Sequence, residues 1–370
     1  MLLTNLKTYD ILTLKTLPIP FPEFGRKQRL YTMKVYTIRD IAEMAGVSVT
    51  TVSRVLNHRP DVNQATRKKV EEVIRSCHFV GNSNARGLKQ GNEVIGVVIR
   101  GRSNPFLSSL AEAILDRADT VPDNFVTEYI DERDDEFQTA VRMTRQNHVK
   151  GLIFVGSLID NRVRAIKGMD VPMVFTTVNA ETAALPRASS IAVDDRAMGR
   201  LVAEELLSLG HTRTAVFGSN PVAGDSLAMR FSGFCEAYTE RGLTYDKSLY
   251  RETRFSYDAG YEIARAFFAE HPDVTALFAM SDTVAVGAIR ALKDLGRSVP
   301  EEVSIVGFDG IDISRFMVTR LTTVEQPVDE IARRSVNLLL DMMEKDAAPR
   351  HILVEAAFRR RESLAQCPHP

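Results

Sequence analysis

The chain has 370 residues, of which 44% are hydrophobic and 26% charged, so we expect a soluble protein of two or three domains. No run of about 18 uninterrupted apolar residues is present, which argues against a membrane-spanning helix. The three cysteines, Cys77, Cys235 and Cys367, form no CxxC motif and no cluster with histidine. We therefore expect no disulfide framework and no bound metal, and a reducing cytoplasm as the location.

Charge is distributed unevenly along the chain, although the net charge is only −1. Residues 1–34 carry six basic and two acidic side chains, and residues 35–92 carry nine and five, which is net +4 in each segment. Residues 93–370 carry 32 basic and 41 acidic side chains, net −9. A basic front joined to an acidic body predicts a polyanion-binding module attached to a body that does not bind polyanions.

The first segment, residues 1–34, has no clean periodicity. Lys7, Asp10 and Lys15 interrupt its apolar stretch, which is unlike a signal peptide. We expect a disordered extension or a misplaced start, with translation beginning at either Met1 or Met33, and assign it no function.

Residues 35–81 predict a headpiece of three short helices. The first ends at Gly46, which can take the positive φ of a tight turn. Ser48 caps a second helix over residues 49–56, and Asn63 caps a third. Two short helices joined by a glycine turn and braced by a third indicate a helix-turn-helix, although a plain three-helix bundle with a solvated polar face remains the alternative.

The exposed face of the predicted second helix favours DNA binding, because it carries small side chains and one arginine in place of the usual Lys/Glu mixture. Arg54 can bridge O6 and N7 of guanine, and the methyl groups of Val49 and Thr50 can contact thymine. Five further polar side chains could donate hydrogen bonds to phosphates, namely Ser48, Thr51, Ser53, Asn57 and Thr66.

From residue 94 onward, short apolar runs alternate with amphipathic segments. The runs cover residues 94–99, 152–155, 172–175, 214–218, 276–280 and 303–308. This alternation predicts buried strands in parallel sheets of a doubly wound α/β fold, long enough for two subdomains. No dinucleotide-binding GxGxxG follows the strand at 94–99 or that at 214–218, and no P-loop, GxSxG elbow or catalytic histidine cluster is present. We expect no enzyme and no cofactor; the alternative is a doubly wound enzyme with an accessory DNA-binding module.

Three segments of the headpiece form recognisable motifs: TIRDIAEMAGVSVTTVSRVLN (37–57), VNQATRKKVEEVI (62–74) and NSNARGLKQ (82–90). The body adds SNPF (103–106), MRFSGF (229–234), SDTVAVG (281–287) and VSIVGFDG (303–310). By these motifs the chain resembles the LacI/GalR family of bacterial transcription regulators, over residues 36 to about 363.

The resemblance implies a role for each part of the chain. Residues 35–81 would be the DNA-binding headpiece, with Val49, Thr50 and Arg54 reading bases. Residues 82–92 would form a hinge helix and linker, with Leu88 wedged into the minor groove. Residues 93–363 would form a core of two α/β lobes, similar to periplasmic sugar-binding proteins, with three crossovers, an effector cleft and the dimer contacts. Residues 364–370 would be a tail.

The effector-binding positions that the resemblance implies are Phe106, Arg230, Phe255, Ser281 and Asp309. Aromatic rings stack on sugar faces, and Arg and Asp form charge-assisted hydrogen bonds to hydroxyl groups. We expect all five just after strands, where doubly wound sheets bind ligands.

Several positions depart from the family pattern. Gly87 lies inside the hinge helix, where glycine costs ~1 kcal/mol relative to alanine. Ser281 replaces the usual Asn, and Thr177 with Val178 replaces an Asp or an Asp/Arg pair. Arg100 and Arg102 follow the first strand of the body; they could accept an anionic sugar, or they could point to solvent.

We therefore expect a cytoplasmic, homodimeric repressor that binds a palindromic operator and is released by a small, carbohydrate-derived effector. A corepressor-dependent or activating regulator of the same family is the alternative.

Overall fold

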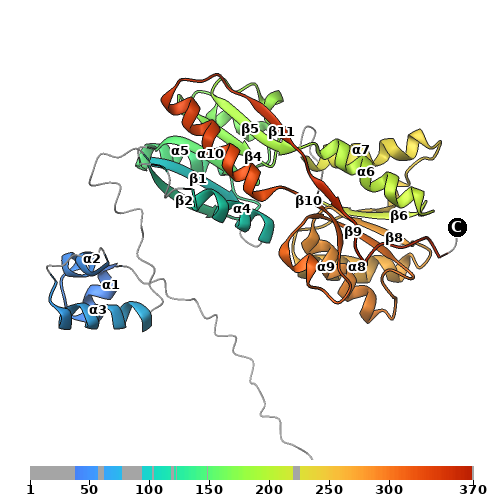
Figure 1. Cartoon of the computed structure of the whole chain (residues 1–370), viewed down its shortest axis with the longest axis horizontal. Helices are drawn as coiled ribbons and strands as arrows, with labels where there is room; N and C mark the ends of the chain where they lie inside the picture. The colour runs from blue at the N-terminus through green and yellow to red at the C-terminus, as the bar shows by residue number, and fades with distance from the viewer. Residues whose placement is uncertain are drawn as a thin grey trace, which may run out of the picture. The chain divides into compact units, whose positions relative to one another are not determined.

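The computed structural model describes residues 38–56, 62–76, 94–101, 104–117, 121, 123–147, 149–219 and 226–368. The chain divides into two compact units, Met1–Asn82 and Ser83–Pro370. The described part of the first unit contains three helices, and that of the second contains one parallel and one mostly parallel sheet with their covering helices (Figure 1).

The headpiece is a bundle of three short helices: α1 (Ile38–Ala45), α2 (Val49–Leu56) and α3 (Gln64–Ser76). Gly46 has a φ of +60° and turns the chain between α1 and α2, a conformation that a β-carbon disfavours. The small core is made of Ile41, Ala42, Ala45, Val52, Val55 and Val70. The predicted helix-turn-helix is confirmed.

The first lobe of the core is built on a sheet whose strands run in the order β11-β5-β4-β3-β1-β2, all parallel. Helices α4 and α10 pack together on one face, and α5 packs on the other. The strands are β1 (Val94–Arg100), β2 (Asn124–Ile130), β3 (Val149–Val155), β4 (Met173–Thr176), β5 (Ala188–Val193) and β11 (His351–Val354). The helices are α4 (Pro105–Leu115), α5 (Glu136–Asn147) and α10 (Val328–Glu344).

The second lobe has a sheet in the order β12-β10-β9-β8-β6-β7, parallel except for β12. The paired helices α6 and α7 lie on one face, and α8 and α9 on the other (Figure 1). The strands are β6 (Thr214–Gly218), β7 (Tyr250–Glu252), β8 (Ala276–Ala279), β9 (Ser304–Asp309), β10 (Thr322–Glu325) and β12 (Ala357–Arg359). The helices are α6 (Asp195–Ser208), α7 (Ser226–Glu240), α8 (Tyr257–Glu270) and α9 (Asp282–Asp294).

The chain passes between the lobes at three places: from β5 to α6, from β10 to α10, and from β11 to β12. The two-lobed, doubly wound core with three crossovers is therefore confirmed. Short 3-10 turns complete the connections, at Asn161–Ile166, Glu181–Ala183, Lys247–Leu249 and Asp312–Arg315.

Two glycines allow α6 and α7 to approach closely. A β-carbon at Gly199 would lie 1.9 Å from the carbonyl oxygen of Arg230, and one at Gly233 would lie 1.9 Å from that of Arg196. Any larger residue would push the helices apart, because a backbone atom cannot yield as a flexible side chain does. This close contact fixes the position of Arg230 against α6.

Candidate functional site

The exposed side of α2 is the candidate nucleic-acid surface. Val52 and Val55 are buried against the other two helices, whereas Thr50 and Arg54 are exposed and Val49 is 41% exposed. The base-reading residues that the sequence predicts thus lie on the outer face of the helix. A single helix with short side chains can enter the major groove, where base edges are distinguishable.

Local hydrogen bonds cap the N-termini of α2 and α3. The Ser48 hydroxyl accepts from the Thr51 amide at 3.1 Å and lies 2.9 Å from the Thr51 hydroxyl. Asn63 caps α3 by accepting from the amide of Thr66, which is half-buried. Ser53 lies within α2, whereas Asn57 and Leu88 lie outside the described residues.

The second candidate site is a cavity of about 250 Å³ between the two lobes of the core. It brings together four of the five predicted effector positions, namely Phe106, Arg230, Phe255 and Asp309. Ser281 does not line it: this residue is fully buried and donates from its hydroxyl to Asp309 Oδ2 at 2.9 Å. Arg230 lies in the second turn of α7, so the expectation that all five follow strands directly is wrong.

Arg230 is held in place by a buried ion pair. Its Nη2 and Nε lie 2.6 and 3.1 Å from Asp195 Oδ1, and its Nη1 donates to the carbonyl of Met280 at 2.7 Å. The guanidinium carbon also lies 3.2 Å from the centre of the Phe308 ring, a cation–π contact. Burial raises the pKa of Asp195, and the neighbouring Arg230 opposes that rise. The guanidinium therefore faces the cavity in one fixed orientation.

Asp309 ends β9 with a φ of 118°, and Thr177, across the cavity, has a φ of 70°. Such conformations are costly for residues other than glycine and gather at functional sites. Gln326 Nε2 donates to Asp309 Oδ1 at 3.0 Å, so both carboxyl oxygens are bound by neutral groups. Burial raises the Asp309 pKa to about 7, because it outweighs the attraction of Arg230.

We expect Asp309→Asn to make the core less sensitive to pH. A folded pKa of about 7, against the usual 3.8, means that the folded state binds the proton more tightly than the unfolded state. Asp309 therefore stabilises the fold below pH 4, and this contribution is lost as the pH rises to 7. The difference in unfolding free energy between variant and wild type should grow by up to about 1.4 kcal/mol per pH unit in that window.

Denaturant titrations between pH 5 and 8 measure this difference. The amide can keep both hydrogen bonds, since the Ser281 hydroxyl can rotate to accept from it. Parallel pH profiles for the two proteins would contradict the assignment.

Cavity residues that the sequence motifs do not reveal come mainly from loops. Glu132 follows β2, an edge strand with mostly half-buried residues that has no clear apolar run. Arg254 lies after the three-residue strand β7, which is equally hard to predict. Asn104 is visible in the SNPF motif; it caps α4 by accepting from the Phe106 amide. The other polar lining residues not predicted are Ser157, Ser219, Ser226, Thr253 and Gln326.

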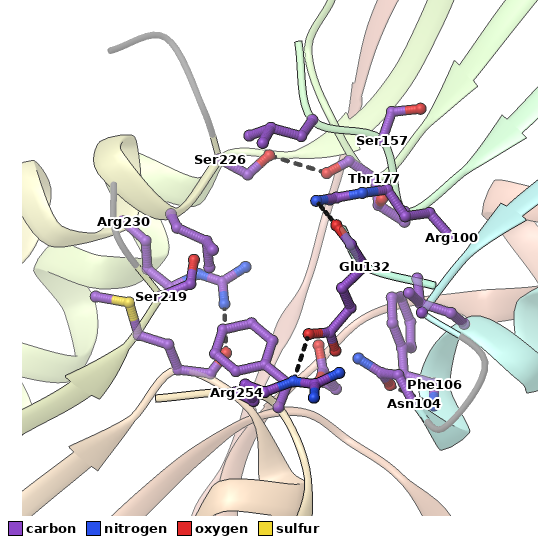
Figure 2. Close-up of a pocket in the computed structure, with 18 of the residues that line it drawn as sticks. Arg100, Asn104, Phe106, Glu132, Ser157, Thr177, Ser219, Ser226, Arg230 and Arg254 are labelled. Atoms are coloured by element: carbon purple, nitrogen blue, oxygen red, sulfur yellow. Dashed lines mark hydrogen bonds and ion pairs between the residues drawn. The ribbon is translucent and has the colours of Figure 1, made fainter. Parts of the chain in front are cut away.

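Arg100 and Arg102 follow the first apolar run of the body, and the sequence leaves open whether they face the cavity or the solvent. The Arg100 side chain lines the cavity and points into it (Figure 2). Arg102 lies outside the described residues.

Polar contacts bridge the two lobes across this cavity. The Ser226 hydroxyl donates to the carbonyl of Thr177 at 2.9 Å. Arg254 lies 3.4 Å from Glu132 Oε2 and 3.6 Å from Asp131 Oδ2 (Figure 2). Contacts of this kind would break and form again as the lobes move, so ligand binding here can be coupled to lobe movement.

The described residues show neither a metal-binding cluster nor a membrane-spanning helix. No group of three or more His, Cys, Asp or Glu side chains there is arranged to hold a metal ion. No helix in the same ranges is long and apolar enough to cross a membrane.

Two family models match the chain. The model described as bacterial regulatory proteins, lacI family, matches residues 37–82, and that of a periplasmic binding protein-like domain matches residues 203–364. The chain is also similar to the HTH-type transcriptional regulator MalR of Clostridium butyricum, with 31% identity over 88% of this chain and 98% of the relative.

Solved structures of similar proteins share the fold over most of this chain. A lac repressor dimer bound to operator and the anti-inducer ONPF matches with a TM-score of 0.67 and 28% identity, over 90% of this chain and 100% of that one. The transcriptional regulator CelR in complex with cellobiose matches with a TM-score of 0.66 and 26% identity, over 89% and 99%.

Proposed function

The chain belongs to the lacI family of bacterial regulatory proteins, and we propose on that basis that it is a repressor whose hold on operator DNA depends on a small, carbohydrate-derived ligand in the core. One observation carries the proposal: the chain joins a helix-turn-helix with an exposed Thr50 and Arg54 to a two-lobed core with a polar cavity. We propose that it acts in the cytoplasm, where bacterial DNA lies, and that it has no catalytic activity.

We propose that α2 enters the major groove. Arg54 then reads guanine, and Val49 and Thr50 contact bases beside it. Leu88 is the proposed minor-groove wedge of the hinge, which kinks DNA at the operator centre. The proposed phosphate contacts, which position the headpiece without reading sequence, are Ser48, Thr51, Ser53, Asn57 and Thr66.

We propose that the cavity holds the ligand between aromatic and charged groups. Phe106 and Phe255 suit the apolar face of a sugar ring, while Arg230 and Asp309 suit its hydroxyl groups. Ser281 would act indirectly, because its hydroxyl orients the carboxyl group of Asp309. The solved CelR complex with cellobiose supports a carbohydrate as the class of ligand.

Selection of binding sites from random DNA by the full chain tests the proposed function. We expect enrichment of one palindromic sequence, because two identical headpieces read two symmetric half-sites. Enrichment of no sequence, with equal affinity for all DNA, would contradict it.

The proposed dimer contacts include an exposed apolar segment after β9. Phe316 is 75% exposed and Val318 fully exposed, and Ile313 beside them is 45% exposed. A second copy of the chain would bury these side chains, and each buried large apolar side chain contributes ~1.5–3 kcal/mol.

We expect Phe316→Asp to weaken the dimer at least tenfold, because the symmetric interface would bury the charge twice. Sedimentation at micromolar concentration should then give the mass of two chains for the wild type and of one chain for the variant. Leu353→Asp, at a 52% exposed position in the first lobe, is the control and should remain dimeric. A wild-type mass of one or four chains would refute the assembly.

A further inference from the structure

The cavity in the core carries an excess of positive charge. Among its described lining residues, Arg100, Arg230 and Arg254 are basic, and only Glu132 and Asp309 are acidic. A neutral sugar requires no such excess. The way in which each charge is already compensated shows where an anion would bind.

The charge of Arg230 is balanced within the protein, because Asp195 pairs with it behind the cavity wall. Asp309 lies near Arg230, and its two carboxyl oxygens accept hydrogen bonds from Ser281 and Gln326. Two arginines remain at the other end of the cavity: Arg254 contacts carboxylates only at 3.4 and 3.6 Å, and Arg100 donates to a main-chain carbonyl.

Arg100 is positioned to receive a ligand. It ends β1, the strand beside edge strand β2 in the first lobe, and its Nη2 donates to the main-chain carbonyl of Glu132, which aims the side chain into the cavity (Figure 2). Its Nε is buried with no hydrogen-bond partner among the described residues. A buried donor left unpaired is costly, so an acceptor supplied by a ligand would relieve that cost.

Arg254 approaches the same end of the cavity from the second lobe. Its contacts with the carboxylates of Glu132 and Asp131 are long, at 3.4 and 3.6 Å, and its side chain is 55% exposed. An anionic group can therefore join this arginine by a small side-chain movement. Glu132 and Asp131 both offset the charge of Arg254, so a ligand anion would compete with them for this arginine and would take its second contact from Arg100.

We propose that the ligand is an anionic sugar derivative whose carboxylate or phosphate binds between Arg100 and Arg254. This inference rests on the proposed ligand-binding function of the core cavity and names the chemical class of its ligand. Planar guanidinium groups bind both anions through paired hydrogen bonds, which are strengthened where water is partly excluded. The cavity of about 250 Å³ suits a ligand the size of a monosaccharide.

A competing explanation is that Arg100 only stabilises the first lobe. It holds the loop at Glu132, and it attracts the buried Glu136, whose pKa burial nevertheless raises to about 7. In that case, replacement of Arg100 would alter stability but not the preference between charged and neutral ligands. The two explanations therefore predict different effects of Arg100 replacement on the ratio of affinities for charged and neutral ligands.

Calorimetric titrations of the full chain at low salt test this ratio. The probes are matched sets: glucose, glucuronate and glucose 6-phosphate; galactose, galacturonate and galactose 6-phosphate; ribose and ribose 5-phosphate; and inorganic phosphate alone. The variants are Arg100→Gln and Arg254→Gln. Arg133→Gln is the matched control, because Arg133 is exposed in the same loop as Glu132 and does not line the cavity.

We expect at least one charged probe to bind the wild type ten times or more tightly than its neutral counterpart. Arg100→Gln should reduce that preference at least tenfold and Arg254→Gln severalfold, while Arg133→Gln should leave it unchanged. Whether the acid or the phosphate binds more tightly identifies the anionic group. Should Arg100→Gln unfold, Arg254→Gln provides the same comparison at a half-exposed position.

Two results would overturn the proposal. One is that neutral sugars bind as tightly as their charged counterparts, or that Arg100→Gln behaves like the control. The other is that no charged probe, phosphate included, binds the wild type. If neutral sugars bind the wild type and Asp309→Asn abolishes that binding, the proposed ligand-binding function of the cavity still holds. The selection of binding sites from random DNA tests the regulatory function separately.

Discussion

Replacement of Arg230 by alanine should lower the free energy of unfolding of the core by about 3–5 kcal/mol. Asp195 would remain in the interior without the cation that pairs with it at 2.6 Å, and both side chains are only 6% exposed. The carbonyl of Met280 would also lose its donor. Removal of one member of a buried pair costs more than the pair contributes, because the remaining group cannot reach water.

Arg196→Ala is a matched control on the same two helices. Arg196 in α6 pairs with Glu236 in α7, and their side chains are 55% and 36% exposed. An exposed pair contributes at most about 1 kcal/mol, so this variant should unfold at nearly the wild-type denaturant concentration. The double variant Asp195→Ala/Arg230→Ala should recover part of the loss. If Arg230→Ala cost no more than Arg196→Ala, the anchoring role would be wrong.

The same ion pair affects how ligand-binding variants should be chosen. Loss of ligand response in Arg230→Ala would have two causes, a missing contact and a weakened lobe. Asp309→Asn keeps its hydrogen-bonding shape and therefore isolates the contact. It should keep operator affinity within a few-fold while it reduces the response to ligand.

Replacement of Arg54 by alanine should weaken binding to the selected operator by about 1–3 kcal/mol at each half-site. The preference at one symmetric base pair should relax, because the bidentate contact to guanine is lost. Arg54 is exposed on α2, so the headpiece should remain folded. Fluorescence anisotropy on the selected site, and on sites changed at that pair, measures both effects.

Lys68→Ala is the control for nonspecific attraction. Lys68 is exposed in the first turns of α3, where it can approach phosphates but not base edges. Its loss should weaken binding to all sequences evenly and reduce the salt dependence by about one unit of slope. An equal loss on selected and random DNA for Arg54→Ala would remove Arg54 from base reading.

The headpiece and most interior strands of the core, namely β1, β3, β4, β6, β8 and β9, were predictable from sequence because their patterns are local. Gly46 and the caps at Ser48 and Asn63 mark helix boundaries, and α2 begins and ends where the sequence predicts. β1 and β9 read as continuous apolar runs because both of their faces are buried.

The remaining strands could not be predicted in this way. β2 lies at a sheet edge with mostly half-buried residues, and β7 and β12 have three residues each, so neither periodicity nor length identifies them. β5 and β10 carry buried Ser or Thr side chains, which interrupt the apolar pattern.

Parts of the site depend on distant pairings that motifs do not show. The partner of Arg230 is Asp195, 35 positions earlier, and the close contact of α6 and α7 brings them together. Ser281 lies behind Asp309 because its hydroxyl supports that carboxylate. The direction of Arg100 depends on a carbonyl in the loop after β2, which the sequence does not place.

The most direct test of the account is to measure the coupling between the two sites. The affinity of the full chain for its selected palindrome should be titrated with and without a saturating ligand from the probe sets. We expect the ligand to change operator affinity by about 5- to 150-fold, and operator DNA to change ligand affinity by the same factor. The account would be contradicted by a ligand that leaves operator affinity unchanged, although it binds in the cavity and its binding is abolished by Asp309→Asn.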